Sequence, residues 1–350
     1  MKTEERIMPA DARQFIFDVL CKENVNSEGA ANVADGLVHA SLRGVDSHGI
    51  RLLPHYLKAL QAGRINPQPN YRFEQTAPAT GILDADHAFG HDSGMQAVRH
   101  AISIAKESGA GCVGVRDSTH FGAASFFGLA IAEADMIGLS FTHSDSLIVP
   151  TAGKQRFLGN NPICFTAPCK GEDPVCLDMA TSVITFNKVL QLREENATAP
   201  AGVGVDAQGR ETCNPHDIVN LMPVGGYKGY GLSLMIEVLC ALLTGMPYGP
   251  HIPRMYDAPI QHRRHLGHFF MALRIDPFAD IQQFKSRMKE MVDELRRATP
   301  VDERIPVMVA GDPEKQTAAK RCQDGLPLRD LDADYFRKAA LDYGVSLKIR

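Results

Sequence analysis

A histidine in the middle of the chain lies between two kinds of apolar pattern. His120 follows the short β-type run Val113–Val115 and a polar turn, and apolar residues then recur at helical spacing over residues 123–134. The start of a helix carries partial positive charge and free N–H groups, so it disfavours an imidazolium ion and attracts anions. A histidine there suits proton transfer beside an anionic substrate. The alternative is a histidine that only caps the helix or packs at the core edge.

Polar side chains also follow the next predicted strand, Ile137–Thr142, at a strand end where site residues commonly lie. Ser144 is a candidate for binding the substrate there. Asp145 is a candidate to pair with an imidazole, since a carboxylate in that position orients the ring and stabilises its charged form. An Asx turn built by Asp145 is the alternative interpretation.

A second histidine, His48, lies in the loop GVDSHG (44–49), just where a helix is expected over residues 50–60. Arg51 follows on the next turn, so the two side chains are expected to face a common space. A guanidinium binds a carboxylate through two hydrogen bonds and stays charged at any working pH, which suits a site for an anionic substrate. A solvated helix charge is the other interpretation of Arg51.

The segment GGYKGYG (225–231) has the composition of a phosphate-binding site. It opens the most apolar helical stretch of the chain, residues 232–243. Glycine lets the backbone approach an anion closely, and Lys228 adds a positive charge at the start of the helix. Close helix packing through glycine is the alternative.

A second such segment is LDMATS (177–182), which turns from a predicted strand into a helix expected over residues 182–195. Thr181 and Ser182 offer hydroxyls there, and the start of the helix offers its N–H groups. Together they predict a contact with a phosphate.

One stretch matches the dinucleotide-binding sequence motif but lacks the order of strand and helix that the motif requires. Gly109, Gly111 and Gly114 spell GxGxxG, but the fingerprint requires a strand before it and a helix that opens on it. Here a helical pattern ends in KESGAG and a strand begins inside the motif. The order is reversed, which argues against a Rossmann site.

We predict no metal site. Asp84, Asp86, His87 and His91 are close in sequence, but their spacing fits neither a helical HExxH pair nor a calcium loop, and a turn is the better interpretation. The eight cysteines are scattered and lack a CxxC zinc spacing, which indicates reduced thiols in the cytoplasm.

The composition is that of a globular chain with a sizeable core, since 44% of the 350 residues are hydrophobic and 22% are charged. A net charge of -4 gives no reason to expect nucleic acid or an acidic membrane as a partner. No apolar run reaches the roughly 18 residues of a membrane span, and the N-terminus is too polar for a signal peptide. The partner is expected to be a small molecule.

Strands and helices mix without regular βαβ spacing, which predicts a mixed sheet covered by helices. The composition breaks at GRINPQP (63–69), so residues 1–70 are expected to form a helical part. Residues 71–276 are expected to form the mixed-sheet domain that binds cofactor and substrate. Residues 277–350 are expected to be largely helical and to pack with residues 1–70, with a short strand over 307–310.

Five ordered motifs resemble the malate/L-lactate dehydrogenase family, which lies outside the Rossmann class. They are RGVDSHGIRLLPHYL (43–57), DSTHFG (117–122) with Ser144-Asp145 downstream, FLGNNPICFTAP (157–168), LDMATS (177–182) and GGYKGYGLSLMIEVL (225–239). The similarity runs from about Arg13 to about Gly344. The family includes malate, lactate, sulfolactate and ureidoglycolate dehydrogenases, diketogulonate reductase and a cyclic-imine reductase.

The resemblance implies an enzyme that moves a hydride between NAD, or NADP, and carbon 2 of a small 2-hydroxy or 2-oxo acid. It implies a largely antiparallel sheet and a homodimer whose active site lies near the subunit interface. Cofactor contacts are implied for Asp178, Met179, Ala180, Thr181, Ser182, Lys188, Gly226, Lys228 and Gly229.

The same resemblance supports roles for the residues singled out above. Arg51 holds the substrate carboxylate, with Ser144 nearby, and Asp145 orients an imidazole. His48 and His120 supply proton transfer and the contact to the substrate oxygen. We favour His120 as the acid/base, because the chain leads from it through one helix to Asp145.

Three other functions stay open at this point. A reductase of a cyclic 2-imino acid belongs to the same family. A metal-assisted hydrolase built from some of the 13 histidines and Asp145 belongs to another class, and it should lose activity to a chelator and ignore NADH. A protein that binds the cofactor without catalysis should quench NADH fluorescence without turnover.

Overall fold

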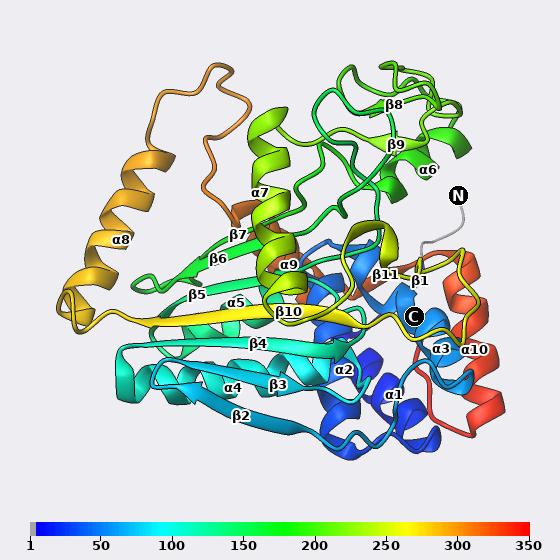
Figure 1. Cartoon of the computed structure of the whole chain (residues 1–350), viewed down its shortest axis with the longest axis horizontal. Coiled ribbons are helices and arrows are strands. Elements are labelled where there is room, and N and C mark those ends of the chain that lie inside the picture. The colour runs from blue at the N-terminus through cyan, green and yellow to red at the C-terminus, as the bar shows by residue number, and fades with distance from the viewer. Residues whose placement is uncertain (1–4) are drawn as a thin grey trace.

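A seven-stranded sheet forms the centre of the molecule (Figure 1). The computed structural model describes residues 5–350, so the first four residues of the predicted helical part lie outside it. The strands, in their order across the sheet, are β2 (Arg72–Ala77), β3 (Thr80–Asp84), β4 (Ala110–Ser118), β10 (Leu266–Arg274), β5 (Met136–Thr142), β6 (Ile163–Ala167) and β7 (Val175–Met179). Neighbouring strands are antiparallel except β3 and β4. The prediction of a mixed, largely antiparallel sheet is confirmed.

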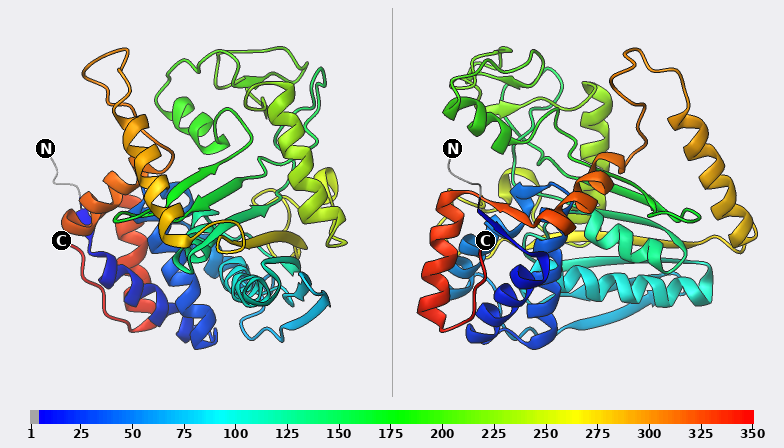
Figure 2. Two further views of the ribbon diagram at one scale, coloured as in Figure 1. Left: turned by 90° about the vertical axis from the view of Figure 1, so that its left-hand side faces the viewer. Right: turned by 180° about the vertical axis from the view of Figure 1, so that it is seen from behind.

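Two helices, α4 (Gly90–Ser108) and α5 (Ser125–Glu133), cover one face of the sheet, which Figure 2 shows from behind. Gly109 ends α4 in the left-handed conformation with φ +85°. A Cβ on Gly111 would lie 2.0 Å from the carbonyl oxygen of Ala101, so this glycine allows β4 to pack closely on α4. The GxGxxG spelling therefore serves helix–strand packing, and the rejection of a Rossmann site is confirmed.

The opposite face is covered at β5 and β10 by α7 (Tyr227–Glu237), which continues into a π-helical turn, Val238–Leu242. Side chains alternate across a strand, so consecutive phenylalanines of β10 face different cores. Phe270 packs in the core beneath α4 and α5, and Phe269 packs against the small cluster that includes Ile236. The site residues at the strand ends are thus held between two packed layers.

Segments from both chain ends gather at one end of the sheet (Figure 1). They are β1 (Glu5–Ile7), α1 (Pro9–Lys22), α2 (Ser27–Leu42), α3 (Leu53–Gln61), β11 (Leu326–Leu328) and α10 (Asp330–Tyr343). Strands β1 and β11 pair antiparallel, and Phe336 stacks on Phe15 with ring centroids 5.2 Å apart. One hydrophobic core therefore joins the two ends of the chain.

One C-terminal helix departs from the expectation that residues 277–350 pack with residues 1–70. Helix α8 (Ile281–Arg296) extends along the far end of the sheet, away from the terminal helices (Figures 1 and 2). Its Lys285 pairs with Asp135 at 2.8 Å. Residues 307–310 form no strand, and helix α9 (Asp312–Asp324) follows instead. Sequence periodicity missed α9 because it is polar, with Asp312 its one buried residue.

A small lobe lies above the sheet and contains α6 (Phe186–Glu194), β8 (Gly204–Val205) and β9 (Asn220–Leu221) (Figure 1). It has its own core, in which Ile148, Val189 and Leu221 are fully buried. Among residues 5–350, no helix combines the length and the apolar character that crossing a membrane requires.

Candidate active site

Two adjoining cavities meet at a common wall that contains His48, His120, Ser144, Asn160 and Thr185. The larger has a volume of about 490 Å³ and extends toward Asp145, Arg254, Tyr256 and Arg264. The smaller, about 210 Å³, extends toward Asp178, Met179 and Ala180. The structure thus brings together residues that were predicted from separate motifs.

The two predicted catalytic histidines stack on each other in this wall. Their ring centroids are 5.4 Å apart and the rings are inclined by 25°. The Nδ1 atom of His48 lies 3.0 Å from the Ser47 hydroxyl, and that of His120 lies 2.7 Å from the Tyr56 hydroxyl. With Nδ1 engaged in both rings, Nε2 is the nitrogen left for a ligand.

The surroundings of these rings favour the neutral imidazole. Burial lowers the pKa of His48 to about 4. Burial also lowers the pKa of His120 well below its ordinary value, and nearby His48 and Arg264 add to the effect. Both rings are therefore neutral at pH 7 when no substrate is present, and each can accept a proton.

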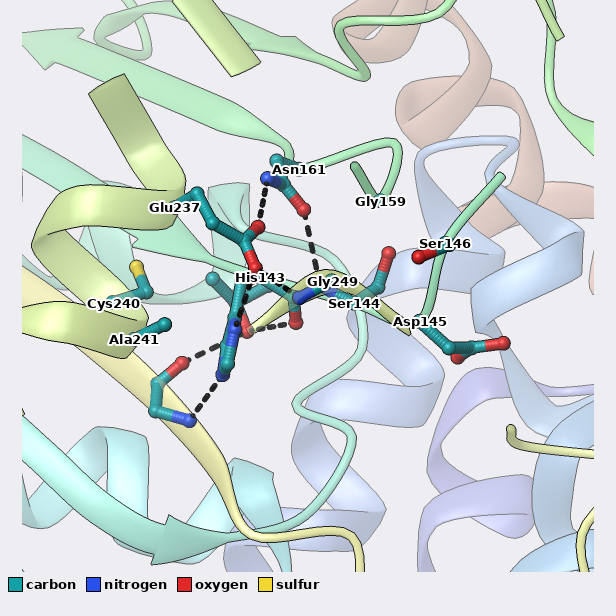
Figure 3. A network of polar contacts seen from close by, with 12 residues as sticks. His143, Ser144, Asp145, Ser146, Gly159, Asn161, Glu237, Cys240, Ala241 and Gly249 are labelled. Atoms are coloured by element: carbon teal, nitrogen blue, oxygen red, sulfur yellow. Dashed lines mark hydrogen bonds and ion pairs between the residues drawn. The ribbon is translucent and has the colours of Figure 1, made fainter. Parts of the chain in front are cut away.

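Asp145 lies in the wall of the larger cavity, but arginines hold its carboxylate. It accepts a hydrogen bond from Nη2 of Arg264, and its second oxygen lies 3.9 Å from Nε of Arg254. His143, two residues earlier, lies on the other side of the backbone (Figure 3). The prediction that Asp145 pairs with an imidazole is wrong, because a permanently charged guanidinium competes better for a buried carboxylate than a neutral ring does.

A buried network holds the backbone beside the cavity (Figure 3). The carboxylate of Glu237 accepts hydrogen bonds from Asn161 Nδ2 at 2.7 Å and from the Gly249 N–H at 2.7 Å, and lies 3.6 Å from Nδ1 of His143. The other end of the Asn161 amide accepts from the Ser144 N–H at 3.1 Å. Since Glu237 belongs to α7, this network connects α7 to Ser144 in the wall shared by the two cavities.

The predicted cofactor segment begins in the smaller cavity with Asp178, Met179 and Ala180. The carboxylate of Asp178 accepts the Ser125 N–H at 2.7 Å, at the start of α5. Burial raises the pKa of Asp178. The same carboxylate therefore lines the cavity and holds the helix that follows His120.

The next residues of the segment lie against the chain that leads into α7. The Thr181 carbonyl accepts the Val224 N–H at 2.9 Å, and Ser182 forms a β-bridge with Pro223. The hydroxyl oxygens of Thr181 and Ser182 are buried and have no hydrogen-bond partner within residues 5–350. Because a buried hydroxyl without a hydrogen-bond partner is unfavourable, these two hydroxyls are suited to bind a ligand that supplies the missing hydrogen bonds.

The start of α7 is open and has free N–H groups. Gly225 and Gly226 have φ values of +61° and +65°, and a Cβ on either would meet no atom within 4 Å. No side chain caps the helix, and Lys228 is exposed. This end of α7 fits an anionic phosphate group. A Cβ on Gly229 would lie 1.9 Å from the Val224 carbonyl oxygen, so close packing explains that glycine.

The sequence pattern of the malate/L-lactate dehydrogenase family matches residues 7–335. The chain belongs to this family. It is 35% identical over 350 residues to the malate dehydrogenase of Pyrococcus abyssi, a match that covers 97% of this chain and 95% of that protein. It is 34% identical over 328 residues to the ureidoglycolate dehydrogenase (NAD(+)) of Escherichia coli K12, with 94% of each covered.

The fold comparison agrees with the sequence comparison. The sulfolactate dehydrogenase of Methanocaldococcus jannaschii superposes with a TM-score of 0.92 and 32% identity, over 97% of this chain and 98% of that one. As a family member the chain is a nicotinamide-dependent dehydrogenase of 2-hydroxy acids. The predicted family, fold and enzyme class are confirmed.

Arg51 does not reach the cavities of this malate/L-lactate dehydrogenase family member. Its Nε lies 3.3 Å from a carboxylate oxygen of Asp332 in α10, and it lines neither cavity. The reason is local: His48 ends one 3-10 turn, Gly49 is extended with ψ -155°, and Arg51 belongs to a second turn, Ile50–Leu52. The helical spacing that was used to place His48 and Arg51 together does not apply across that break.

Two cofactor predictions also change in detail. Helix α6 begins at Phe186 and is capped by Thr185, so Thr181 and Ser182 precede the helix start instead of forming it. Lys188 is exposed on α6, where its ammonium donates to Gln191 at 3.1 Å, and it lines neither cavity. The structure therefore brings Asp178–Ser182 toward Gly226 and Lys228, but leaves Lys188 apart.

Sequence reasoning missed Tyr56, which contacts His120, and Arg264, which lines the larger cavity. Tyr56 lies in the quoted motif LLPHYL, but a tyrosine on the apolar face of α3 resembles a core residue. Arg264 stands in a basic loop just before β10, and its side chain is only 3% exposed. Its position next to a strand end was the signal available, as for Ser144.

Proposed function

We propose that this chain interconverts a small 2-hydroxy acid and its 2-oxo acid with NAD, using the larger cavity as the substrate site. The observation that supports this most strongly is the meeting of the stacked His48–His120 pair with Arg264 in one cavity of about 490 Å³. The oxidation of such a substrate requires one group that transfers a proton and one that binds the carboxylate. Nicotinamide, when bound, accepts or supplies the hydride at carbon 2.

His120 is the proposed acid/base. The Tyr56 hydroxyl at 2.7 Å from Nδ1 fixes the ring and leaves Nε2 for the substrate oxygen. Because the empty site keeps His120 neutral, it can take the hydroxyl proton during oxidation. In the reverse direction an anionic substrate favours the imidazolium that donates the proton. His48, stacked beside it, is proposed to orient the substrate oxygen.

Arg264 is the proposed carboxylate-binding residue, in place of Arg51. Its Nε donates to the Pro253 carbonyl at 2.9 Å and its Nη2 to Asp145, while Nη1 has no partner within residues 5–350. Arg156 lies close enough to Arg254, Asp257 and Asp145 for their charges to shift its pKa. Three arginines thus face Asp145 and Asp257, an excess of positive charge that favours an anion.

For the cofactor we propose that Asp178–Ala180 border the nicotinamide end and that the start of α7 receives a phosphate group. The fit of free N–H groups and open glycines at Gly225–Gly226 supports this. We propose NAD as the cofactor because the similar Escherichia coli enzyme is a ureidoglycolate dehydrogenase (NAD(+)).

We also propose a homodimer that packs through α7. Apolar side chains on α7 and its π-helical turn are exposed, including Leu234 at 45% and Leu242 at 56%, and Leu243, which follows the turn, is 61% exposed. An exposed apolar patch of this kind on a helix typically marks a protein interface.

The experiment is a panel of 2-oxo acids and one cyclic 2-imino acid, each measured with NADH and with NADPH. The proposal expects oxidation of NADH with at least one small 2-oxo acid and retention of that activity in a chelator. Turnover of the imino acid alone would reassign the substrate class. Binding of NADH without any turnover, or activity that a chelator abolishes, would contradict the proposal.

A further inference from the structure

Three potential metal ligands meet where three neighbouring strands of the sheet begin or end, outside both cavities. His87 follows β3, Asp117 is near the end of β4, and His265 immediately precedes β10. Strands β3, β4 and β10 are neighbours, and β10 runs antiparallel to the other two. The carboxyl ends of β3 and β4 therefore lie beside the amino end of β10, which brings the three side chains together.

The donor atoms are close enough to share one ion. One ligand atom from each of His87, Asp117 and His265 lies within 4.8 Å of the other two. The Nδ1 of His265 is 2.5 Å from the Asp117 carboxylate, and the rings of His87 and His265 are 4.9 Å apart and nearly perpendicular. Two bonds of about 2.0–2.2 Å at a tetrahedral angle place their donor atoms about 3.4 Å apart, so side-chain movements of about 1–1.5 Å bring the three atoms to one ion.

His87 is the residue that an internal ion pair alone does not explain. Its side chain is mostly buried, with the residue 8% exposed, and its Nδ1 has no hydrogen-bond partner within residues 5–350. A neutral imidazole has the lone pair that a metal ion requires.

The backbone also holds all three residues in place. His87, Asp117 and His265 have φ values of +59°, +52° and +49°, a left-handed conformation that the surrounding sheet must maintain. The His87 N–H donates to the Asp117 carbonyl at 2.7 Å. His265 and Asp117 have side chains that are 43% and 26% exposed, so an ion can enter from solvent.

We propose that His87, Asp117 and His265 form a binding site for one divalent transition-metal ion of the Zn²⁺ type, completed by water. Two imidazoles and one carboxylate suit Zn²⁺, Co²⁺ or Ni²⁺, whereas Mg²⁺ and Ca²⁺ prefer oxygen ligands only. The site is not part of the proposed hydride transfer. His265 is the residue after Arg264, but Arg264 is itself held by the Pro253 carbonyl and by Asp145, so its position does not depend on the ion.

The test is a titration of the full chain without a histidine tag, first freed of metal, with Zn²⁺ by calorimetry and with Co²⁺ by visible absorption. One ion per chain is expected, with a Co²⁺ spectrum of nitrogen and oxygen ligation, and Mg²⁺ should not compete. His265→Ala and His87→Ala should each weaken binding at least about 10- to 100-fold, since that loss is typical even for partners outside the ligand shell.

His262→Ala is the matched control, because His262 is exposed in the same loop and is not part of the cluster. It should bind as the unchanged chain does. The rise in Tm that saturating Zn²⁺ causes should appear in the unchanged chain and in the control but not in Asp117→Asn, a conservative change that reports binding if an alanine variant misfolds.

No binding by the unchanged chain, or binding that survives His265→Ala and His87→Ala, would overturn the site and leave an ion pair only. Because binding is measured without substrate or cofactor, the result does not depend on the proposed dehydrogenase chemistry.

Discussion

At the scale of single residues, charge and burial decide which side chains can do chemistry. His48 and His120 are both predicted site residues, and the structure stacks them in one wall, but only His120 contacts the Tyr56 hydroxyl. Nδ1 of His48 is held by the Ser47 hydroxyl instead, so both rings keep Nε2 for a ligand and they differ in the residue that holds them. The Asp145 carboxylate, which we predicted to pair with an imidazole, instead accepts a hydrogen bond from Arg264.

The first prediction separates the two histidines. His120→Asn should lower kcat by about 10²- to 10⁴-fold, because it removes the acid/base, and His48→Asn should mainly raise KM. For oxidation, kcat/KM should rise as pH rises through the lowered pKa of His120 and then level off, because the neutral ring is the active form. Steady-state pH profiles of both variants test this, and loss of the pH limb in His48→Asn alone would exchange the roles.

The second prediction uses two arginines that were both candidates for the carboxylate. Arg264→Lys should raise KM for the 2-oxo acid about 10- to 100-fold, because one or two hydrogen bonds to the substrate carboxylate are lost. NADH binding should change little. Arg51→Lys is the matched control and should leave KM nearly unchanged, because Arg51 pairs with Asp332. A larger effect at Arg51 than at Arg264 would return the carboxylate to Arg51.

At the scale of elements, helix α7 connects three features of the molecule. Its start is open to an anion, its Glu237 holds the network that fixes Ser144 (Figure 3), and its exposed side is apolar. A second subunit that packed on this apolar side would contact the helix whose Glu237 is hydrogen-bonded, through Asn161, to Ser144 in the cavity wall. In the proposed function, α7 would therefore connect the phosphate site, the substrate cavity and the subunit interface.

The third prediction compares two lysines that were both assigned to the cofactor. Lys228→Ala should weaken NADH binding about 3- to 10-fold, because a charge is lost at the start of α7, and the effect should shrink at high salt. Lys188→Ala should have no such effect, since Lys188 donates to Gln191 on the exposed face of α6. Fluorescence titration with NADH measures both, and equal losses would move the phosphate toward α6.

The fourth prediction concerns assembly. Leu234→Glu combined with Leu242→Glu should convert the proposed dimer to a monomer, because two charges would be buried in an apolar interface. Leu341→Glu is the control, since Leu341 is 83% exposed on α10 at the other end of the molecule. Sedimentation gives the oligomeric state, and a dimer in the double variant would exclude α7 as the interface.

At the scale of the whole molecule, several buried histidines link folding to pH. Burial lowers the pKa of His39, His91 and His268 to about 3 and that of His48 to about 4. In the unfolded chain a histidine titrates near about 6.5. Below that pH the unfolded state binds protons that the folded state does not, so folding loses free energy as the pH falls.

The fifth prediction follows from that sign. The free energy of unfolding should be steady above about pH 6.5 and should fall below it, by up to about 1.4 kcal/mol per pH unit for each such histidine, until the folded-state values near pH 3–4 are reached. Urea unfolding between pH 7.5 and 5 measures the slope. His39→Gln should reduce it, and the exposed His216→Gln should not. A slope that is unchanged in His39→Gln would remove His39 from this account.

The sequence by itself determined the family, the class of enzyme, most helices and strands, and the two histidines, because these depend on local periodicity and on short motifs. It also excluded a Rossmann site, since the order of helix and strand around Gly109–Gly114 is local information. Only the tertiary structure decided which side chains pair with each other. Asp145 and Arg264 are 119 residues apart in the sequence, and Asp117 and His265 are 148 residues apart. Those distances are closed by the strand order β3-β4-β10-β5, which follows from how the layers pack and not from any single segment.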